Sequence, residues 1–156
     1  MDKKKLIKYS VDYLSKFDTS KKNLKDVLKR KIFKLSNSSD EKKILFNSIE
    51  SILNILETKN FINDERYLQS KISYLSQSGK SERYISNYLL KKGIDKQNIE
   101  NGLIKFSNEN LDWEIRSAKL FAKKKKLLES EEKYEKKLSK MARAGFRYDI
   151  CIKILG

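Results

Sequence analysis

The segments Leu89-Leu90-Lys91-Lys92-Gly93-Ile94 and Lys140-Met141-Ala142-Arg143-Ala144-Gly145-Phe146 share one pattern. Each is an apolar-periodic, lysine-bearing stretch that stops at a glycine and continues at once with an apolar residue. The two glycines stand 52 positions apart, and an apolar or cysteine residue follows each of them at both six and ten positions further on. A repeated spacing of this size predicts a helical unit that is used more than once.

The composition favours helices along the whole chain. The 156 residues include no proline and only five glycines, so little in the sequence would break a helix. Hydrophobic residues recur at spacings of three and four in about nine segments, which is the period of an amphipathic helix. No segment shows the alternation that a half-buried strand requires. The sequence therefore predicts an all-α protein.

The nine segments fall into three groups of three. They predict three tandem three-helix repeats that stack into an elongated, curved module, because units this small cannot bury a core alone. The first repeat is expected to cover residues 1–62 and to be atypical and longer. The second is expected to cover residues 63–109 and the third residues 110–156.

Polar residues mark where several helices should begin. Thr19 or Ser20, then Ser81, then Asp95 can accept a hydrogen bond from a first-turn amide and so cap the helix that follows. Aromatic residues at core-periodic positions are expected to pack inside rather than to stack on a ligand; they are Tyr67, Tyr84, Tyr88 and Phe121. Trp113 follows Asp112 at a helix start, and this position is equally compatible with a buried and with an exposed side chain.

The net charge is +15, and the excess lies at both ends of the sequence. Residues 1–34 contain 12 basic and 4 acidic side chains, residues 35–112 contain 11 of each, and residues 113–156 contain 13 and 6. A chain that is positive at each end suits an extended acidic partner, such as nucleic acid or a nucleoprotein polymer. The alternative is compositional, since 30 lysines against 6 arginines are also typical of an AT-rich genome.

The residues that most enzymes use are missing. The chain has no histidine for general-base work near neutral pH. No glycine-rich loop follows a strand, and Cys151 is a lone cysteine, so we expect no phosphate cradle, metal, disulfide or cofactor. The N-terminus is too polar for a signal peptide and no apolar run is long enough to span a membrane. The sequence predicts a cytoplasmic, monomeric protein that is not an enzyme.

Three basic clusters are the candidate partner-binding residues. Each could contact a polyanion or an acidic protein surface, although surface lysines are often only solvated. The clusters are the lysine face of the second predicted helix with the arginine after it (Lys21, Lys22, Lys25, Lys29 and Arg30), the run Lys123, Lys124, Lys125 and Lys126, and the pair Arg143 and Arg147 that flanks Gly145.

The stretches 61–67 (FINDERY), 79–81 (GKS) and 89–94 (LLKKGI) form an ordered set of short motifs that resembles the middle repeat of the RecX family, bacterial proteins that regulate the recombinase RecA. Residues 143–149 (RAGFRYD) look like its third-repeat turn, and residues 13–17 and 23–28 are similar to the first repeat of some alphaproteobacterial members. Arg147 departs from the small polar cap that the family more often has, and the first repeat lacks the glycine stop.

The resemblance implies a function as well as a fold. It implies three three-helix repeats that lie in the groove of the RecA–single-stranded DNA filament and restrain ATP hydrolysis, strand exchange and cleavage of the SOS repressor. Basic residues at both ends would reach separate protomers or DNA. Direct contact with single- or double-stranded DNA stays open. The alternative function is a helical-repeat protein that binds DNA or RNA directly, through phosphates and with little sequence preference.

Overall fold

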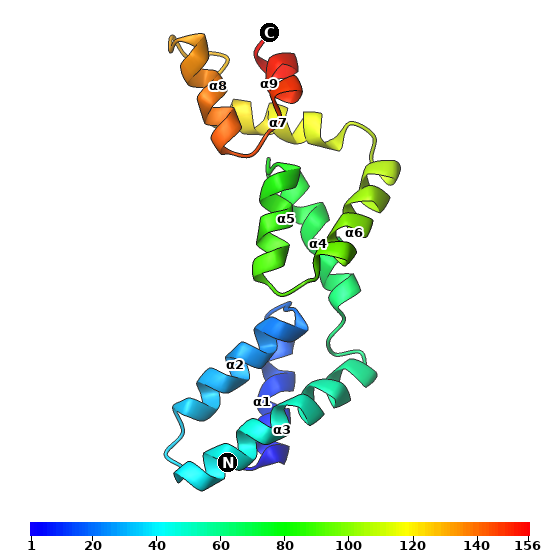
Figure 1. The fold of residues 1–156 in the computed structure, drawn as a ribbon, viewed down its shortest axis with the longest axis vertical. Helices are drawn as coiled ribbons and strands as arrows, with labels where there is room; N and C mark the ends of the chain where they lie inside the picture. Colours follow the sequence, from blue (N-terminus) through cyan, green and yellow to red (C-terminus); the bar gives the residue numbers. More distant parts are fainter. The chain divides into compact units, whose positions relative to one another are not determined.

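The structure, a computed structural model, describes residues 1–156 and contains nine α-helices and no β-strand (Figure 1). The all-α prediction is therefore confirmed. The helices are α1 (Lys3–Lys16), α2 (Lys21–Phe33), α3 (Ser39–Thr58), α4 (Asp64–Gln77), α5 (Glu82–Lys91), α6 (Lys96–Glu109), α7 (Trp113–Lys124), α8 (Tyr134–Arg143) and α9 (Tyr148–Leu155).

The chain forms two compact units. The first unit is Met1–Tyr67 together with Lys92–Ile94, and the second unit is Leu68–Lys91 together with Asp95–Gly156. The expected repeat boundaries after residues 62 and 109 stay a prediction.

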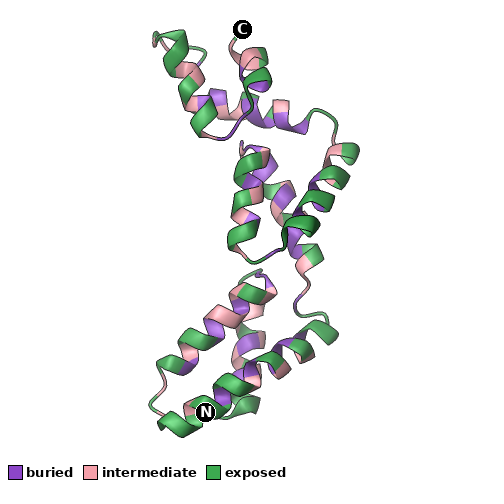
Figure 2. Ribbon diagram, in the orientation of Figure 1, coloured by how far each residue is buried: buried purple, intermediate pink, exposed green.

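Helices α1, α2 and α3 pack against one another in the first unit. Each turns its apolar stripe inward, so buried and exposed residues alternate along each helix (Figure 2). Burying one aliphatic side chain of this size contributes about 1.5–3 kcal/mol. The core residues are Leu6, Leu24, Val27, Leu28, Ile32, Leu45, Ile49, Ile52, Leu53, Leu56 and Ile62.

Helices α7, α8 and α9 enclose a core within the second unit. Its buried members are Ala118, Ala122, Leu127, Met141, Phe146, Ile150 and Cys151. Burial raises the pKa of the Cys151 thiol, whose Sγ donates to the Phe146 carbonyl at 3.6 Å.

Trp113 belongs to the interior of the second unit. It is only 6% exposed, and its ring meets that of Phe106 edge-on at 5.6 Å between centroids. Its indole Nε1 donates to Ser107 Oγ at 3.0 Å, so the polar edge of the ring is satisfied.

The tyrosine predictions have mixed outcomes. Tyr67 is buried as expected, and Phe121 and Tyr88 are half-buried. The prediction for Tyr84 is wrong, because its side chain is 41% exposed. Ile85 and Leu89, four residues apart, form the buried stripe of α5 and leave Tyr84 beside it, where Lys80 Nζ lies 4.6 Å from the ring centroid.

The three predicted helix caps are confirmed. Ser20 Oγ accepts from the Asn23 amide at 3.2 Å, Ser81 Oγ from Tyr84 at 3.1 Å, and Asp95 Oδ1 from Asn98 at 2.8 Å. Each bond satisfies a first-turn amide that has no partner inside its own helix.

The two repeated glycines close helices in the left-handed conformation, with φ of +84° at Gly93 and +99° at Gly145. At the second turn the Phe146 amide donates to the Met141 carbonyl at 3.2 Å, and the Gly145 amide donates to Ala142 at 3.0 Å. This pair of bonds is the Schellman arrangement that satisfies carbonyls at a helix end.

The same polar junction is formed twice. In the first unit, Ser20 Oγ donates to the Lys92 carbonyl at 2.5 Å, and the Lys21 amide donates to Asp64 Oδ1 at 2.8 Å. We call this the first junction.

In the second unit, Ser81 Oγ donates to the Ala144 carbonyl at 2.8 Å, and the Glu82 amide donates to Glu114 Oε2 at 2.7 Å. We call this the second junction. In both junctions a capping serine bonds the carbonyl just before a turn glycine, and the next amide bonds a carboxylate.

Close approach explains the glycines at these junctions. A Cβ atom at Gly93 would overlap the side chain of Lys22, and a Cβ atom at Gly145 would overlap Ser81 Oγ. Each position therefore excludes a side chain twice, once by its backbone conformation and once by its neighbour.

Glu114 is the buried charge of the second junction. Desolvation raises the pKa of its carboxyl above the ordinary value of 4.5, although the bond from the Glu82 amide opposes this shift. Arg147 Nη2 lies 3.6 Å from Glu114 Oε1 but is itself largely exposed, so its stabilising charge is screened by solvent.

Valine at either turn glycine should destabilise the protein by about 1 kcal/mol or more, because left-handed backbone strains a side chain. We expect a comparable cost at both positions, since the added Cβ would meet the hydrogen-bonded Ser81 Oγ at Gly145 and the Lys22 Cβ, which its backbone holds in place, at Gly93. Urea unfolding measures both effects. Gly156→Val is the control for steric overlap, because φ is also positive there, at +88°, but nothing lies within 4 Å of a Cβ. Unchanged stability at both positions would show that neither glycine is required.

Replacing Glu114 should separate its hydrogen bond from its charge. Glu114→Ala leaves the Glu82 amide without its partner and should cost roughly 1–3 kcal/mol. Glu114→Gln keeps an oxygen acceptor and loses the buried charge.

The pH dependence of the Glu114 variants has a definite sign. Because the pKa of Glu114 is raised in the folded state, the parent's carboxyl contributes most to stability at pH values below its ordinary pKa of 4.5. This contribution falls as the pH rises from that ordinary value through the raised folded-state pKa. The free energy of unfolding of Glu114→Gln relative to the parent should therefore increase from about pH 4 to about pH 7. A difference that is constant or declines over that range would contradict the buried-charge interpretation.

Candidate functional site

The lysine face of α2 is divided by acidic partners on α3. Lys21 Nζ lies 3.3 Å from Glu57 Oε1, and Lys25 Nζ lies 2.6 Å from Glu50 Oε1. The hydrogen bond from Lys25 holds the pKa of Glu50 below its ordinary value, with smaller contributions from nearby lysine charges. These pairs are partly exposed and contribute little to stability. They do neutralise the charges of Lys21 and Lys25, which the sequence analysis had assigned to partner binding.

The rest of the predicted first cluster separates into two places. Lys22 packs at the turn of Gly93 in the first junction. Lys29 and Arg30 are exposed at the far end of α2 and line a cavity of about 310 Å³ with Phe33, Lys34 and Phe46. We call this the Phe33 cavity. Sequence analysis missed its last three residues; the available signal was that Phe33 lies outside the apolar period of its helix.

The run Lys123–Lys126 stands at the end of α7 rather than along a helix. Only Lys123 and Lys124 are helical, while Lys125 is the C-cap and Lys126 has φ of +55°. The Leu127 amide donates to the Ala122 carbonyl at 2.9 Å and closes the turn. Positive side chains at this end of a helix offset the negative end of its dipole, so part of the run has a structural role.

The four lysines point to different environments. Lys124 Nζ donates to the Ser78 carbonyl at 3.1 Å. Lys123 and Lys126 line a cavity of about 360 Å³, whose other lining residues are Lys119, Ala122, Leu128, Glu129, Lys153 and Ile154. We call this the Lys123 cavity. None of the four lysines that line the Lys123 cavity (Lys119, Lys123, Lys126 and Lys153) forms a salt bridge. Sequence analysis missed Lys119 and Lys153; the spacing of four between Lys119 and Lys123 is the signal that could have indicated the first.

The third predicted cluster does not act as one patch. Arg143 is exposed in the last turn of α8 and forms no salt bridge. Arg147 is the N-cap residue of α9 without a capping bond, and it faces Glu114 and Asp149 at 3.6 and 3.8 Å.

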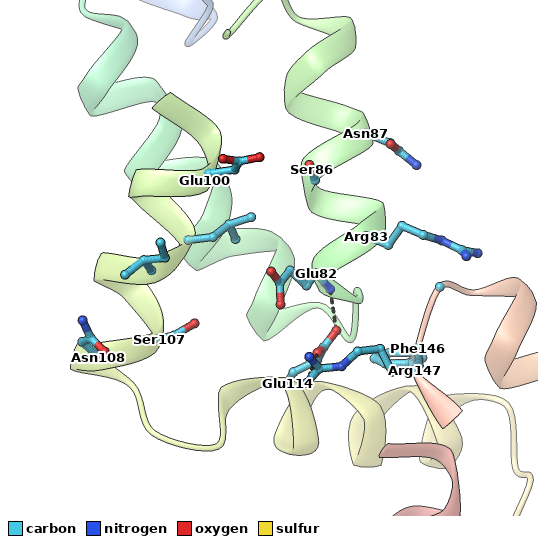
Figure 3. Close-up of a pocket in the computed structure, with 13 residues that line it drawn as sticks. Glu82, Arg83, Ser86, Asn87, Glu100, Ser107, Asn108, Glu114, Phe146 and Arg147 are labelled. Atoms are coloured by element: carbon cyan, nitrogen blue, oxygen red, sulfur yellow. Dashed lines mark hydrogen bonds and ion pairs between the residues drawn. The ribbon is translucent and has the colours of Figure 1, made fainter. Parts of the chain in front are cut away.

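Arg147 also lines a groove of the second unit, of about 760 Å³. Figure 3 shows its walls: Arg83 and Asn87 from α5, Glu100 and Asn108 from α6, and Phe146 with Arg147 from the turn before α9. We call this the α5–α6 groove. Because its side chains carry both signs of charge, it suits a polypeptide better than a polyanion.

Neither a metal site nor a membrane-spanning helix is found in the structure. No three histidine, cysteine, aspartate or glutamate side chains are grouped so that they could hold a metal ion. None of the nine helices combines the length and hydrophobicity needed to cross a bilayer. The candidate site therefore consists of two cation-lined cavities, one in each unit, and the α5–α6 groove.

Comparison with known proteins finds one family. A family model described as RecX, second three-helix domain, matches residues 63–103. The regulatory protein RecX of Myxococcus xanthus is 27% identical over 154 residues, which cover 94% of this chain and 81% of that protein. The regulatory protein RecX of Haemophilus ducreyi is 33% identical over 127 residues, covering 81% of this chain and 75% of that protein.

A solved structure agrees. The crystal structure of RecX from Lactobacillus salivarius has a TM-score of 0.70 and 26% sequence identity, and the match covers 97% of this chain and 93% of that one. Sequence and fold thus match along almost the whole chain, and at the identity and coverage of the Haemophilus protein this chain belongs to the RecX family of regulatory proteins.

Proposed function

We propose that this protein is a negative modulator of RecA that binds in the groove of the RecA–single-stranded DNA filament and lowers its ATPase, strand-exchange and coprotease activities. Membership of the RecX family supports the choice of partner. The protein acts by binding, with no hydrolytic activity of its own.

The observation that carries the proposal is that each unit has a cluster of cations that form no salt bridge. Lys29, Arg30 and Lys34 in the first unit form no salt bridge, nor do the four lysines of the Lys123 cavity in the second. Elsewhere on α2, cations do have carboxylate partners within the chain. Positive groups left without partners on both units suit an extended acidic surface, and a nucleoprotein filament presents one.

The α5–α6 groove offers a second kind of contact. Its mixture of arginine, glutamate and amide side chains can pair with either sign on a protein partner. We assign it to protein contact with a RecA protomer and the cation clusters to acidic side chains or phosphates.

Substoichiometric protein should lower the DNA-dependent ATPase of RecA, because one bound module can hold back more than one protomer. The measurement is steady-state ATP hydrolysis by RecA on single-stranded DNA at low salt. The assay without RecA is its control and should show no hydrolysis. RecA turnover that is untouched at equimolar protein would refute the proposal.

Removing two charges from the Lys123 cavity should weaken filament binding without harming the fold. The variant Lys123→Gln/Lys126→Asn avoids placing a negative charge at a helix C-terminus. It also relieves position 126, because asparagine tolerates left-handed backbone better than lysine. We expect binding to weaken more than tenfold, roughly 1.4 kcal/mol, with a melting temperature no lower than that of the parent.

The matched control for this variant is Lys96→Gln/Lys105→Gln, which removes two exposed charges from α6 of the same unit. It should weaken binding much less. The salt dependence identifies the acceptor, since each lost phosphate contact should reduce the slope of log affinity against log salt by roughly 0.7–0.9. If the cavity variant binds as tightly as the parent, the lysines are only solvated.

A further inference from the structure

The Phe33 cavity brings two exposed aromatic rings together with cations that form no salt bridge. Phe33 is 76% exposed, more than any other large apolar side chain, and Phe46 beside it is 36% exposed. Single exposed apolar residues are ordinary on protein surfaces. Two phenylalanines that line one cavity outside the core are not, because a shared apolar patch marks a place of contact.

The charges around these rings are available to a ligand. Lys29, Arg30 and Lys34 line the cavity and form no salt bridge, although the charge of Lys29 is one of the smaller contributions that lower the pKa of Glu50. Lys42 Nζ donates to the Phe33 carbonyl at 3.0 Å and lies 5.8 Å from the centroid of the Phe33 ring. The acidic side chain that α3 offers to this side of α2, Glu50, is already bonded to Lys25.

The size and shape of the cavity limit what it can hold. Its volume of about 310 Å³ lies at the lower end of the range for small-molecule sites, about 300–1,000 Å³. Its lining combines two aromatic side chains with three long cationic ones, whose stems are apolar and whose ends are positive. A planar ring that is attached to an anion matches both parts.

We propose that the Phe33 cavity binds single-stranded nucleic acid, with a base stacked on Phe33 and entering beside Phe46, and with the flanking phosphates facing Lys29, Arg30 and Lys34. Stacking on an aromatic side chain beside a positively charged track is the general way in which proteins hold single strands without sequence preference. Duplex DNA does not fit, since its bases are already stacked and paired. An acidic peptide would use the cations but would leave both rings exposed.

This inference concerns naked nucleic acid and the first unit, so it does not depend on the proposed action on RecA. The probe is a fluorescently labelled oligothymidylate, measured by anisotropy with the full chain. A labelled abasic oligonucleotide of the same length, with the same phosphates and no bases, is measured beside it.

Replacing Phe33 tests the stacking. We expect Phe33→Ala to bind oligothymidylate about tenfold more weakly, with the salt slope unchanged because no phosphate contact is lost. Phe17→Ala is the matched control, since Phe17 is also an exposed phenylalanine of the first unit, at 54%, and should bind like the parent. The abasic strand should bind the parent and Phe33→Ala equally weakly.

Replacing the cations tests the phosphate track. Lys29→Gln/Lys34→Gln should reduce the salt slope by roughly 0.7 per lost contact on a single strand and should weaken binding to both oligonucleotides.

The variant Phe33→Trp supplies a signal that a merely structural role would not give. It should bind oligothymidylate more tightly than Phe33→Ala does, and the fluorescence of the new tryptophan should be quenched as a base stacks on its indole. The native Trp113 is buried in the second unit and serves as the internal background, measured in the parent.

Three results would overturn the proposal. The first is equal affinity of the parent for the abasic strand and oligothymidylate, which would mean electrostatic attraction only. The second is unchanged binding by Phe33→Ala, or binding by Phe33→Trp without quenching. The third is displacement of the labelled strand by poly-glutamate as effectively as by unlabelled oligothymidylate, which would indicate an acidic protein partner. The RecA ATPase assay on the same variants is scored separately, so either proposal can fail while the other stands.

Discussion

Two glycine turns and the serine caps that face them set the packing of the helices. At each junction one hydroxyl acts twice, because it accepts from an amide of its own helix and donates to a carbonyl of a distant turn. The turn can approach the hydroxyl only because the glycine beside that carbonyl has no side chain. Backbone conformation, helix capping and tertiary contact thus depend on the same few atoms, and a change in one disturbs the other two.

Most of the local structure could be predicted from the sequence because its causes are local. A capping serine lies three residues from the amide that it satisfies, and a glycine stop is visible as the end of an apolar period. The all-helical fold followed from such signals together with the absence of proline. The junction bonds could not be predicted, since Ser20 and Lys92, like Ser81 and Ala144, are separated by 72 and 63 residues.

The candidate site was harder to predict for the same reason. The charge of a lysine is visible in the sequence, but its partner is not: Lys21 and Glu57 are 36 residues apart, and their pairing leaves the other end of α2 as its available cationic surface. Phe33 was missed because apolar periodicity identifies the residues that a helix buries and does not distinguish exposed residues that bind a partner from those that are only solvated. Tyr84 was misplaced because helices with short apolar stripes allow more than one assignment of the core face.

The two cation-lined cavities differ in what they offer besides charge. The Phe33 cavity has aromatic walls, whereas the lining of the Lys123 cavity includes the aliphatic side chains of Ala122, Leu128 and Ile154. Flat π-faces select planar partners, while aliphatic surface accepts an apolar side chain of any shape. A partner that combines nucleic acid with protein has use for both, so two basic regions of similar charge need not be redundant.

The buried thiol of Cys151 has a practical consequence. The thiolate is the reactive form of cysteine, and burial raises the pKa of this one and shields its sulfur from reagents. Because the chain contains no other cysteine, the native protein is already close to an unreactive background for maleimide chemistry. Single cysteines can therefore be introduced into the otherwise unaltered sequence, one in each unit, and carry a dye pair whose energy transfer measures the distance between the two dyes in solution.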